Sequence, residues 1–552
     1  MYETLFYSLL LSPFLLLAIT KLLKHAILTS HINLPPSPLA LPILGHLHLL
    51  KQPLHRTLYN LSKCHGPIFS LRFGSHPVVV LSSPSAVEEC FGKNDVVLAN
   101  RPRLALGKYV GYNSTGLGLS PYGPHWRNLR RLVTLDLFSS SSLNASTGIW
   151  RDEVKLSLRK LYHVSACGNF VKVKMKSMFS ELVFNIVMRL VAGKRYYGGG
   201  DEASGIEEAK EFRELIEELC ELAVSSYPGD FLPVLQWIDY NGHIKRLKKA
   251  GRKADKFLQG LVDEHRSNKD AFKKKNTMLS HLLTLQESEP EYYTDETIKA
   301  LILVMLNAGT DTTAVTLEWA MSNLLNHPDI LQKARNELDT QVGQEHLIEE
   351  IDLSKLQYLK NIISETLRLY PATPLLVPHF SSNHCTLGGY DISPNTIVFV
   401  NAWAIQRDPN LWEDSTGFKP ERFESDDKEG DDVPKLLPFG MGRRACPGMG
   451  LANRVLGLVL GSLIQCFEWK RVSEKRIDMN EGKGLTMPKV EPLEAMCKPR
   501  SIASKLRLNP NTHFTIISNL TATISNLTAI VTNLTATAVF NLTGGKHTTH
   551  PN

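Results

Sequence analysis

One cysteine near the C-terminal end of the chain stands in a setting that suits metal chemistry. The segment from Phe439 to Gly448 surrounds Cys446 with three glycines and two arginines. A thiolate needs positive charge and backbone N–H donors, and Cys446 precedes a helical pattern, Leu451 to Phe467, whose N-terminus carries partial positive charge. Glycines also permit close approaches that side chains would block. This arrangement fits a thiolate presented to haem iron, which favours O–O cleavage, so we expect oxygen activation.

A lone cysteine is more often a small buried hydrophobe, which is the alternative for Cys446. The spacing of Phe, Gly, Arg and Cys in its segment nevertheless resembles the haem-thiolate loop of the cytochrome P-450 family. The resemblance covers about residues 1–500. It implies the cytochrome P-450 fold, haem b as the cofactor and Cys446 as the axial ligand of the iron. It also implies O2 as co-substrate and electrons from NADPH, delivered by an NADPH-cytochrome reductase that carries FAD and FMN.

Small and polar residues interrupt a long apolar helical pattern, Ile298 to Asn326. The interruption, Ala308 to Thr313, contains glycine, threonine and aspartate, which are weak helix formers. The resemblance implies that this helix covers the oxygen side of the haem, with Asp311 and Thr312 as the acid and the alcohol of a proton relay. The alternative is a threonine hydroxyl that bonds back to the helix carbonyls beside a solvent-facing aspartate.

Glu365 and Arg368 stand three residues apart in the helical pattern Asn361 to Tyr370, so their side chains share a face and can pair. An exposed ion pair of this spacing contributes little stability, which is the usual explanation. Further along the chain, a Pro-Glu-Arg-Phe segment supplies Arg422. The resemblance implies that these three side chains form a Glu-Arg-Arg network that braces the cysteine loop.

Four residues are candidates for binding the carboxylates of the haem. Trp126 and Arg130 lie four apart in a helical pattern and would project side by side, and both side chains can donate to a carboxylate. The resemblance implies that these two hold a haem propionate and that His379 and Arg444 occupy further propionate positions. For His379 the alternative is a satisfied histidine of the core.

Charge and cysteine content exclude several classes of function. The 552-residue chain is 43% apolar, enough for a large core, and its net charge of +7 includes no long basic block, so nucleic-acid binding is not indicated. Its 8 cysteines form neither a zinc pair nor a disulfide framework, which fits a cytosol-facing domain. Basic residues near the expected proximal side of the haem would suit an acidic reductase: Arg127, Arg130, Arg131, Lys435 and Arg443.

The N-terminus predicts a membrane anchor. Residues 5–20 are almost wholly apolar and two lysines follow on the C-terminal flank. Glu3 and the lack of an Ala-x-Ala site argue against a cleaved signal peptide. We therefore expect residues 1–24 to form a single-pass transmembrane helix in the endoplasmic reticulum membrane, with the catalytic domain in the cytosol. A stiff proline-rich hinge, 25–45, comes next and resembles that of microsomal cytochromes P-450.

The remaining pattern is mainly α with a small β-sheet region. Two branched apolar runs, Ile68 to Phe73 and Val78 to Ser82, predict a hairpin around a Gly-Ser-His-Pro turn. Helical spacing dominates up to residue 370, for example in Glu207 to Val224. We expect residues 46–500 to form one haem-thiolate monooxygenase domain. The last segment, 501–552, repeats Asn-Leu-Thr and predicts a low-complexity tail to which we assign no function.

The resemblance is closest to the plant group that contains isoflavone 2'-hydroxylases and isoflavone 3'-hydroxylases. We therefore expect hydroxylation of a small apolar phenolic metabolite, an isoflavonoid or another flavonoid. The alternatives are oxidation of a lignan, an indole derivative or a xenobiotic, rearrangement of a hydroperoxide, or a haem-binding membrane protein without turnover. The segments that the resemblance places at the substrate are chiefly apolar with scattered hydroxyls, as in a hydrophobic pocket: 101–119, 212–237, 301–312, 372–379 and 484–488.

Overall fold

The computed structural model describes residues 33–165, 168–197, parts of 210–222, 228–269, 277–424 and 435–506. The predicted anchor, 1–24, and the chain beyond residue 506 lie outside the described residues. Half of the residues of the helix predicted at 207–224 also lie outside them.

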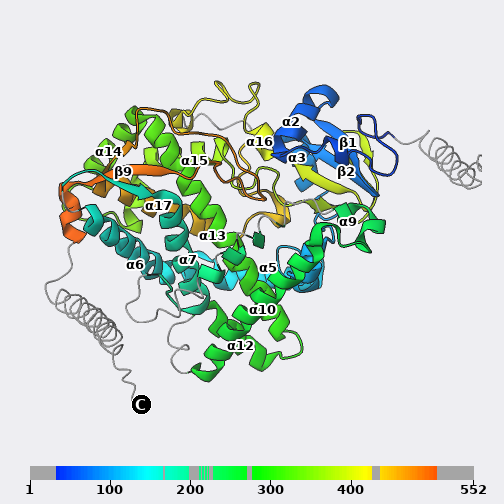
Figure 1. The fold of residues 1–552 in the computed structure, drawn as a ribbon, viewed down its shortest axis with the longest axis horizontal. Helices are drawn as coiled ribbons and strands as arrows, with labels where there is room; N and C mark the ends of the chain where they lie inside the picture. Colours follow the sequence, from blue (N-terminus) through cyan, green and yellow to red (C-terminus); the bar gives the residue numbers. More distant parts are fainter. Residues whose placement is uncertain are drawn as a thin grey trace, which may run out of the picture.

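Helices form the body of the protein, which confirms the mainly α prediction (Figure 1). Helix α13 (Asp295–Asn326) runs through the middle and packs along α7 (Met175–Ala192). It begins after Thr294, whose side chain accepts a hydrogen bond from the Thr297 amide. Two acidic residues in its first turn stabilise the helix because they lie at the positive end of its dipole. It corresponds to the helix predicted from Ile298 to Asn326 and begins three residues earlier.

The other helices surround α13. Helix α17 (Met449–Cys466) is apolar and almost entirely buried over its last three turns. Both α13 and α17 are long and apolar enough to cross a membrane, but 67% of the most apolar window of each is buried inside the protein, so both are core helices. The other α-helices whose bounds the structure describes are α2 (Leu54–His65), α3 (Pro84–Phe91), α4 (Ala105–Tyr109), α5 (Pro124–Arg131), α6 (Ser140–Ser165), α9 (Pro228–Phe231), α10 (His243–Ser267), α12 (Met278–Ser288), α14 (Pro328–Gln341), α15 (Gln357–Leu369) and α16 (Ala402–Ile405).

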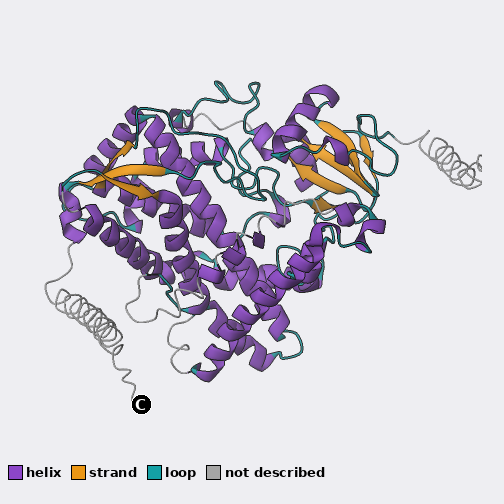
Figure 2. Ribbon diagram, viewed as in Figure 1, coloured by secondary structure: helices purple, strands orange, loops and turns teal. Residues whose placement is uncertain are grey.

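Two small sheets lie on opposite sides of the helical body (Figure 2). The predicted hairpin is confirmed, because β1 (Ile68–Phe73) and β2 (His76–Leu81) pair antiparallel. Its turn is shorter than expected, since Gly74 adopts a left-handed φ of 55° and the second strand already begins at His76. The first sheet has the strand order β1-β2-β7-β4, in which β7 is Ile397–Val400 and β4 is His379–Phe380. The second has the order β3-β9-β8, in which β3 is Val171–Lys174, β9 is Glu494–Pro499 and β8 is Phe467–Arg471. A separate two-stranded hairpin is formed by β5 (Cys385–Leu387) and β6 (Tyr390–Ile392).

Both ends of the described chain extend the body beyond the predicted domain limits. The Ser70 amide donates to the Pro36 carbonyl over 2.7 Å, and Asn33 exchanges hydrogen bonds with Asp391, so the described part of the hinge is docked on the first sheet and the β5–β6 hairpin. At the other end a 3-10 turn (Ser501–Leu506) buries three apolar side chains. Residues 501–506 therefore belong to the folded body and not to the tail.

Candidate active site

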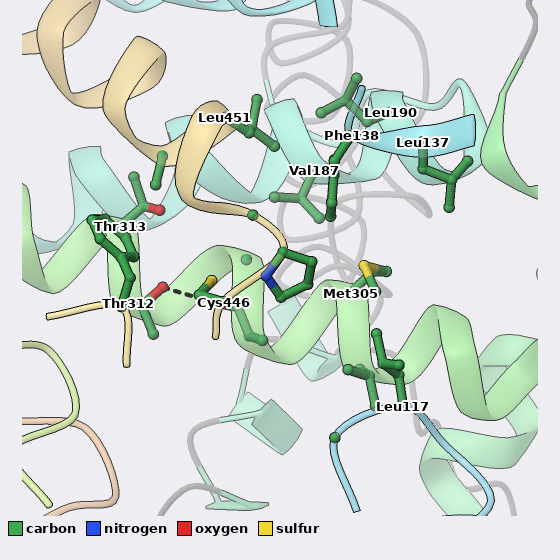
Figure 3. Close-up of a pocket in the computed structure, with 18 of the residues that line it drawn as sticks. Leu117, Leu137, Phe138, Val187, Leu190, Met305, Thr312, Thr313, Cys446 and Leu451 are labelled. Carbon is green, nitrogen blue, oxygen red and sulfur yellow. Dashed lines mark hydrogen bonds between the residues drawn. The ribbon is translucent and has the colours of Figure 1, made fainter. Parts of the chain in front are cut away.

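An apolar cavity of about 570 Å³ lies between α13, α7 and the loop that precedes α17 (Figure 3). Cys446 and Thr312 both line it, so the structure brings the predicted thiolate and the predicted alcohol to one space. The apolar wall is supplied by Leu117, Leu137, Phe138, Val187, Leu190, Met305 and Leu451. Six of the eight cysteines fall in the described part of the chain and all six are free thiols.

The cysteine loop is shaped by glycines in left-handed backbone conformations. Gly440 and Gly442 both have a φ of 68°, and a Cβ on Gly442 would approach Asp95 Oδ1 to 2.7 Å. The Cys446 amide donates to the Phe439 carbonyl over 2.8 Å, which closes the loop. A residue with a side chain would be strained at either glycine.

The electrostatic setting of Cys446 differs from the prediction in the source of its positive charge. Burial raises the pKa of the Cys446 thiol, while the Gly448 amide, the Arg130 charge and the Met449 amide act in the opposite direction. The nearby Arg443 turns elsewhere, since it pairs with Asp95 at 3.2 Å. Cys446 is exposed to the cavity, and a cation bound to its sulfur would further stabilise the thiolate.

Cationic side chains form one rim of the cavity. Three of the four predicted propionate ligands, Trp126, His379 and Arg444, lie here together with Arg101. All four side chains are held by backbone carbonyls: Arg444 donates to Ala99, Leu117 and Ser120, Arg101 to Gly118, Val377 and Pro378, Trp126 Nε1 to Leu117, and His379 Nδ1 lies 2.7 Å from the Leu98 carbonyl. Arg130, the fourth predicted ligand, also lines the cavity and donates to the Ala445 carbonyl over 2.6 Å.

The arginines of the rim have no acidic counter-charge within the described part of the chain. Burial and the charge of Arg444 lower the pKa of Arg101 to about 9, and burial also lowers that of Arg444 to about 10. Among the described residues, no carboxylate forms an ion pair with Arg101, Arg130 or Arg444. Buried cations are costly unless paired, so this rim fits a ligand that brings its own carboxylates, as haem does.

The predicted relay residues have separate surroundings on α13. Thr312 Oγ1 donates to the Ala308 carbonyl over 2.7 Å, which is the back-bonded geometry considered as the alternative, yet this threonine lines the cavity. Asp311 does not line the cavity; its Oδ2 accepts a hydrogen bond from Thr486 over 2.6 Å. Gly309 lines the cavity, and a Cβ there would come within 3.2 Å of the Val187 side chain on α7, so this glycine allows a close packing of the two helices.

The predicted three-residue ion network is present and buried. Arg368 and Glu365 form a two-pronged pair with distances of 2.7 and 2.8 Å, and neither side chain is exposed. Arg422 Nε joins at 3.0 Å from Glu365 Oε1. The Lys419 amide and the Gly417 carbonyl satisfy further atoms of the network. Exposed ion pairs contribute little to folding stability, whereas removing one partner of a buried pair is costly, so the burial of this network gives it a role in stability.

Gln406 connects this network to the cysteine loop. Its side-chain amide donates to the carbonyls of Leu367 and Arg368, and its Oε1 accepts the Leu437 amide over 2.7 Å. Leu437 stands just before Phe439, which accepts the Cys446 amide. Sequence reasoning missed Gln406, because a lone glutamine just after a short helix carries no pattern. It also missed Arg101 as a rim cation and Thr486 as a partner of Asp311, since both act across long sequence separations.

A cysteine presented to a cavity with a cationic rim, opposite a threonine in a long helix, defines a haem-thiolate monooxygenase. The cytochrome P450 family model matches residues 35–493, and the chain belongs to that family. It is 59% identical over 475 residues to cytochrome P450 81Q32 of Catharanthus roseus, covering 86% of this chain and 93% of the relative. It is 54% identical to (+)-piperitol/(+)-sesamin synthase CYP81Q2 of Sesamum radiatum (87% and 93% covered) and 52% identical to isoflavone 3'-hydroxylase of Medicago truncatula (91% and 99% covered). The cofactors are therefore haem b and O2, with electrons from NAD(P)H through a reductase.

Proposed function

We propose that this protein hydroxylates a small apolar phenolic plant metabolite, an isoflavonoid or another flavonoid. The observation that carries the proposal is the cavity: apolar walls with a few hydroxyls surround Cys446, and a relative at 52% identity is an isoflavone 3'-hydroxylase. Thr312 and Thr373 are hydroxyl-bearing residues of this lining. A flat phenolic substrate would pack against the leucines and valines and find hydrogen-bond partners at these threonines.

Each group of residues at the site would have its own task. Haem, when bound, supplies the oxygen activation, and Cys446 would be its axial thiolate. We assign Trp126, Arg130, His379 and Arg444 to its carboxylates, and the guanidinium groups of Arg130 and Arg444 suit this role. The single N–H of Trp126 is bound to the Leu117 carbonyl and that of the neutral His379 to the Leu98 carbonyl, so these two side chains would line the carboxylates without donating to them. Leu, Val and Met side chains exclude water from the space beside them.

Proton delivery would be the task of Asp311 and Thr312. The Thr312 hydroxyl reaches the cavity while it donates to the Ala308 carbonyl, so its oxygen can accept a hydrogen bond from a water molecule. Asp311 would supply protons from the neighbouring face of α13. The glycine between Ala308 and Thr310 leaves room for small molecules next to this hydroxyl.

Electrons would come from an NADPH-dependent FAD/FMN reductase, and the protein would sit on the endoplasmic reticulum membrane. Exposed Arg127 and Arg131 on α5, with Arg443 in the cysteine loop, offer positive charge near the cysteine for an acidic reductase. The apolar stretch within residues 1–24 supports a single-pass anchor with this domain on the cytosolic side.

A second candidate is the oxidation of a lignan. One relative at 54% identity is a (+)-piperitol/(+)-sesamin synthase, and the same apolar walls would accept a lignan.

Microsomes containing the protein and reductase should be incubated with a panel of isoflavones, flavonoids and lignans, with and without NADPH, and analysed by mass spectrometry. An oxygenated isoflavone or flavonoid that requires NADPH supports the proposal. Products from lignans alone support the second candidate, and haem binding without any product contradicts both.

Two variants test the assigned residues. Cys446→Ser should abolish the thiolate absorption band of the carbon monoxide complex, because a hydroxyl cannot replace the sulfur anion; an unchanged band would refute the ligand assignment.

Thr312→Ala should retain haem but divert reducing equivalents to peroxide, with product per NADPH falling by about tenfold to a hundredfold. Undiminished coupling in Thr312→Ala would exclude the hydroxyl from proton delivery.

A further inference from the structure

The acid of the proposed relay is held by a residue from a distant part of the chain. Thr486 Oγ1 donates to Asp311 Oδ2 over 2.6 Å, and Thr486 is 7% exposed. Thr312 lines the cavity while Asp311 does not. The alcohol of the relay therefore bonds to its own helix, whereas the acid accepts a bond from the segment before β9.

The segment that carries Thr486 is anchored upstream by a buried cluster. Glu481 Oε2 lies 2.7 Å from His55 Nε2 and 2.8 Å from Arg56 Nε, and its Oε1 accepts from Trp403 Nε1 over 2.8 Å. Burial alone would raise the pKa of Glu481, but the bonds from His55 and Arg56 hold it at about 2. Burial lowers the pKa of His55, so we assign it as a neutral donor to an ionised Glu481.

Downstream, the segment is tied both to α13 and to the cavity wall. The Met487 amide donates to the Ala372 carbonyl over 2.9 Å, and Trp319 Nε1 on α13 donates to the Met487 carbonyl over 2.7 Å. Ala372 lines the cavity. With both ends fixed, the Thr486 hydroxyl has a defined position relative to Asp311, and one peptide unit separates it from a residue bonded to the wall.

We propose that Thr486 is a positioning residue for proton delivery: its hydroxyl fixes the carboxylate of Asp311 and so controls how that acid serves Thr312. The inference rests on the relay role proposed above for Asp311. A hydrogen bond to a charged group is about twice as strong as one between neutral groups, so a single hydroxyl can hold a carboxylate in one orientation. Because Met487 bonds to Ala372, a substrate that displaces this wall would also act on Thr486.

Other charged groups surround Glu318, which lies two turns further along α13. Glu318 is buried and accepts the Leu493 amide over 2.7 Å, and burial and the like charge of Asp311 raise its pKa. Lys489 donates to the Asp478 carbonyl, and Lys176 acts on Glu318 through its charge. Thr486 donates to Asp311 as a neutral group, so its hydrogen bond orients the carboxylate without adding charge of its own.

The balance of the reaction shows what a failure of positioning would produce. Hydroxylation consumes RH, O2, NADPH and H⁺ and yields ROH, H2O and NADP⁺, so one oxygen atom enters the C–H bond and the other leaves as water with both protons. If protons arrive at the wrong place, the same two electrons leave as hydrogen peroxide from O2, NADPH and H⁺. The division of NADPH between product and peroxide thus measures the relay.

The experiment uses full-length, haem-loaded protein with reductase in membranes. Four variants are compared with wild type: Thr486→Val, Thr486→Ser, Asp311→Asn and the double variant Asp311→Asn/Thr486→Val. Thr396→Val is the matched control, because Thr396 is also buried and its hydroxyl donates to the Ser393 carbonyl over 2.7 Å, away from the cavity. Product, peroxide and the solvent deuterium isotope effect on NADPH oxidation are measured with isoflavone (3-phenylchromen-4-one) as probe. A second arm without organic substrate compares peroxide with water.

We expect Thr486→Val to raise the ratio of peroxide to product, or of peroxide to water, by about tenfold and to increase the isotope effect. Thr486→Ser should stay near wild type, and the double variant should be no worse than Asp311→Asn. If Asp311→Asn uncouples while Thr486→Val behaves like Thr396→Val, the positioning role is wrong and the relay stands. If neither Asp311→Asn nor Thr486→Val changes the ratio, the relay itself is wrong. If Thr486→Val does not bind haem, Thr486→Ala takes its place, because it removes the same hydroxyl without putting a methyl group there. The same ratios of peroxide to product then apply to Thr486→Ala.

Discussion

The Glu365 network and the cationic rim of the cavity are both buried and charged, but one is complete and the other is not. In the network, two arginines surround one carboxylate, and backbone carbonyls satisfy the remaining guanidinium donors. On the rim, Arg101 and Arg444 have carbonyl partners and no acidic partner among the described residues. A buried cation that is paired with a carboxylate of the chain serves the scaffold, and a buried cation without such a partner marks the place of a ligand.

The largest effect on stability is expected from a substitution in the Glu365 network. Glu365→Gln leaves Arg368 buried without its anion and should lower the free energy of unfolding by about 3–5 kcal/mol, measured by chemical denaturation or as loss of haem-loaded protein. As a control, Lys333→Ala removes an exposed lysine that pairs with Glu421 and Glu424 and should cost less than about 1 kcal/mol. Equal effects of the two substitutions would contradict the distinction between buried and exposed pairs.

A substitution on the rim should act on the cofactor more than on the fold. Arg101→Gln removes a buried cation that has no acidic partner among the described residues, so we expect haem to dissociate about tenfold faster or more, measured by transfer to a haem-accepting protein. Arg101→Lys keeps the charge but loses the planar fork and should fall between Arg101→Gln and wild type. Unchanged haem dissociation in Arg101→Gln would show that this arginine is a structural cation.

The smallest expected effect is a change in how the free energy of unfolding depends on pH. Burial, Arg101 and Arg444 lower the pKa of His379 well below 6.5, so the folded protein keeps this histidine neutral. The unfolded chain binds the proton, and stability is therefore full above pH 6.5 and lost as the pH falls below it, by up to about 1.4 kcal/mol per pH unit. In His379→Gln this part of the slope should vanish, while the part due to His55 remains. An identical slope in His379→Gln and wild type would mean that the histidine is not buried as a neutral group.

The helices and the cysteine loop could be predicted from the sequence because their signals are local. The α13 and α15 patterns and the β1–β2 hairpin follow from apolar periodicity and turn residues, and all three lie where expected. The glycines near Cys446 pointed to the loop because strained backbone needs them. Contacts across the fold carried no such signal. Arg130, which we expect at a propionate, also acts through its charge on Cys446, and Asp311 is bonded to Thr486, 175 positions away.

The docking of residues 33–45 on the first sheet has a practical consequence for anyone who shortens the chain to obtain soluble protein. Pro36 and Asn33 contribute backbone hydrogen bonds to β1 and to the β5–β6 hairpin, so cutting after residue 45 would strip a sheet edge of its cover and expose it to other molecules. A start at or before residue 32 keeps that cover. It also fixes where the described chain leaves the globule, since Asn33 is bonded to Asp391 on the β5–β6 hairpin, so an upstream anchor would attach on that side of the protein.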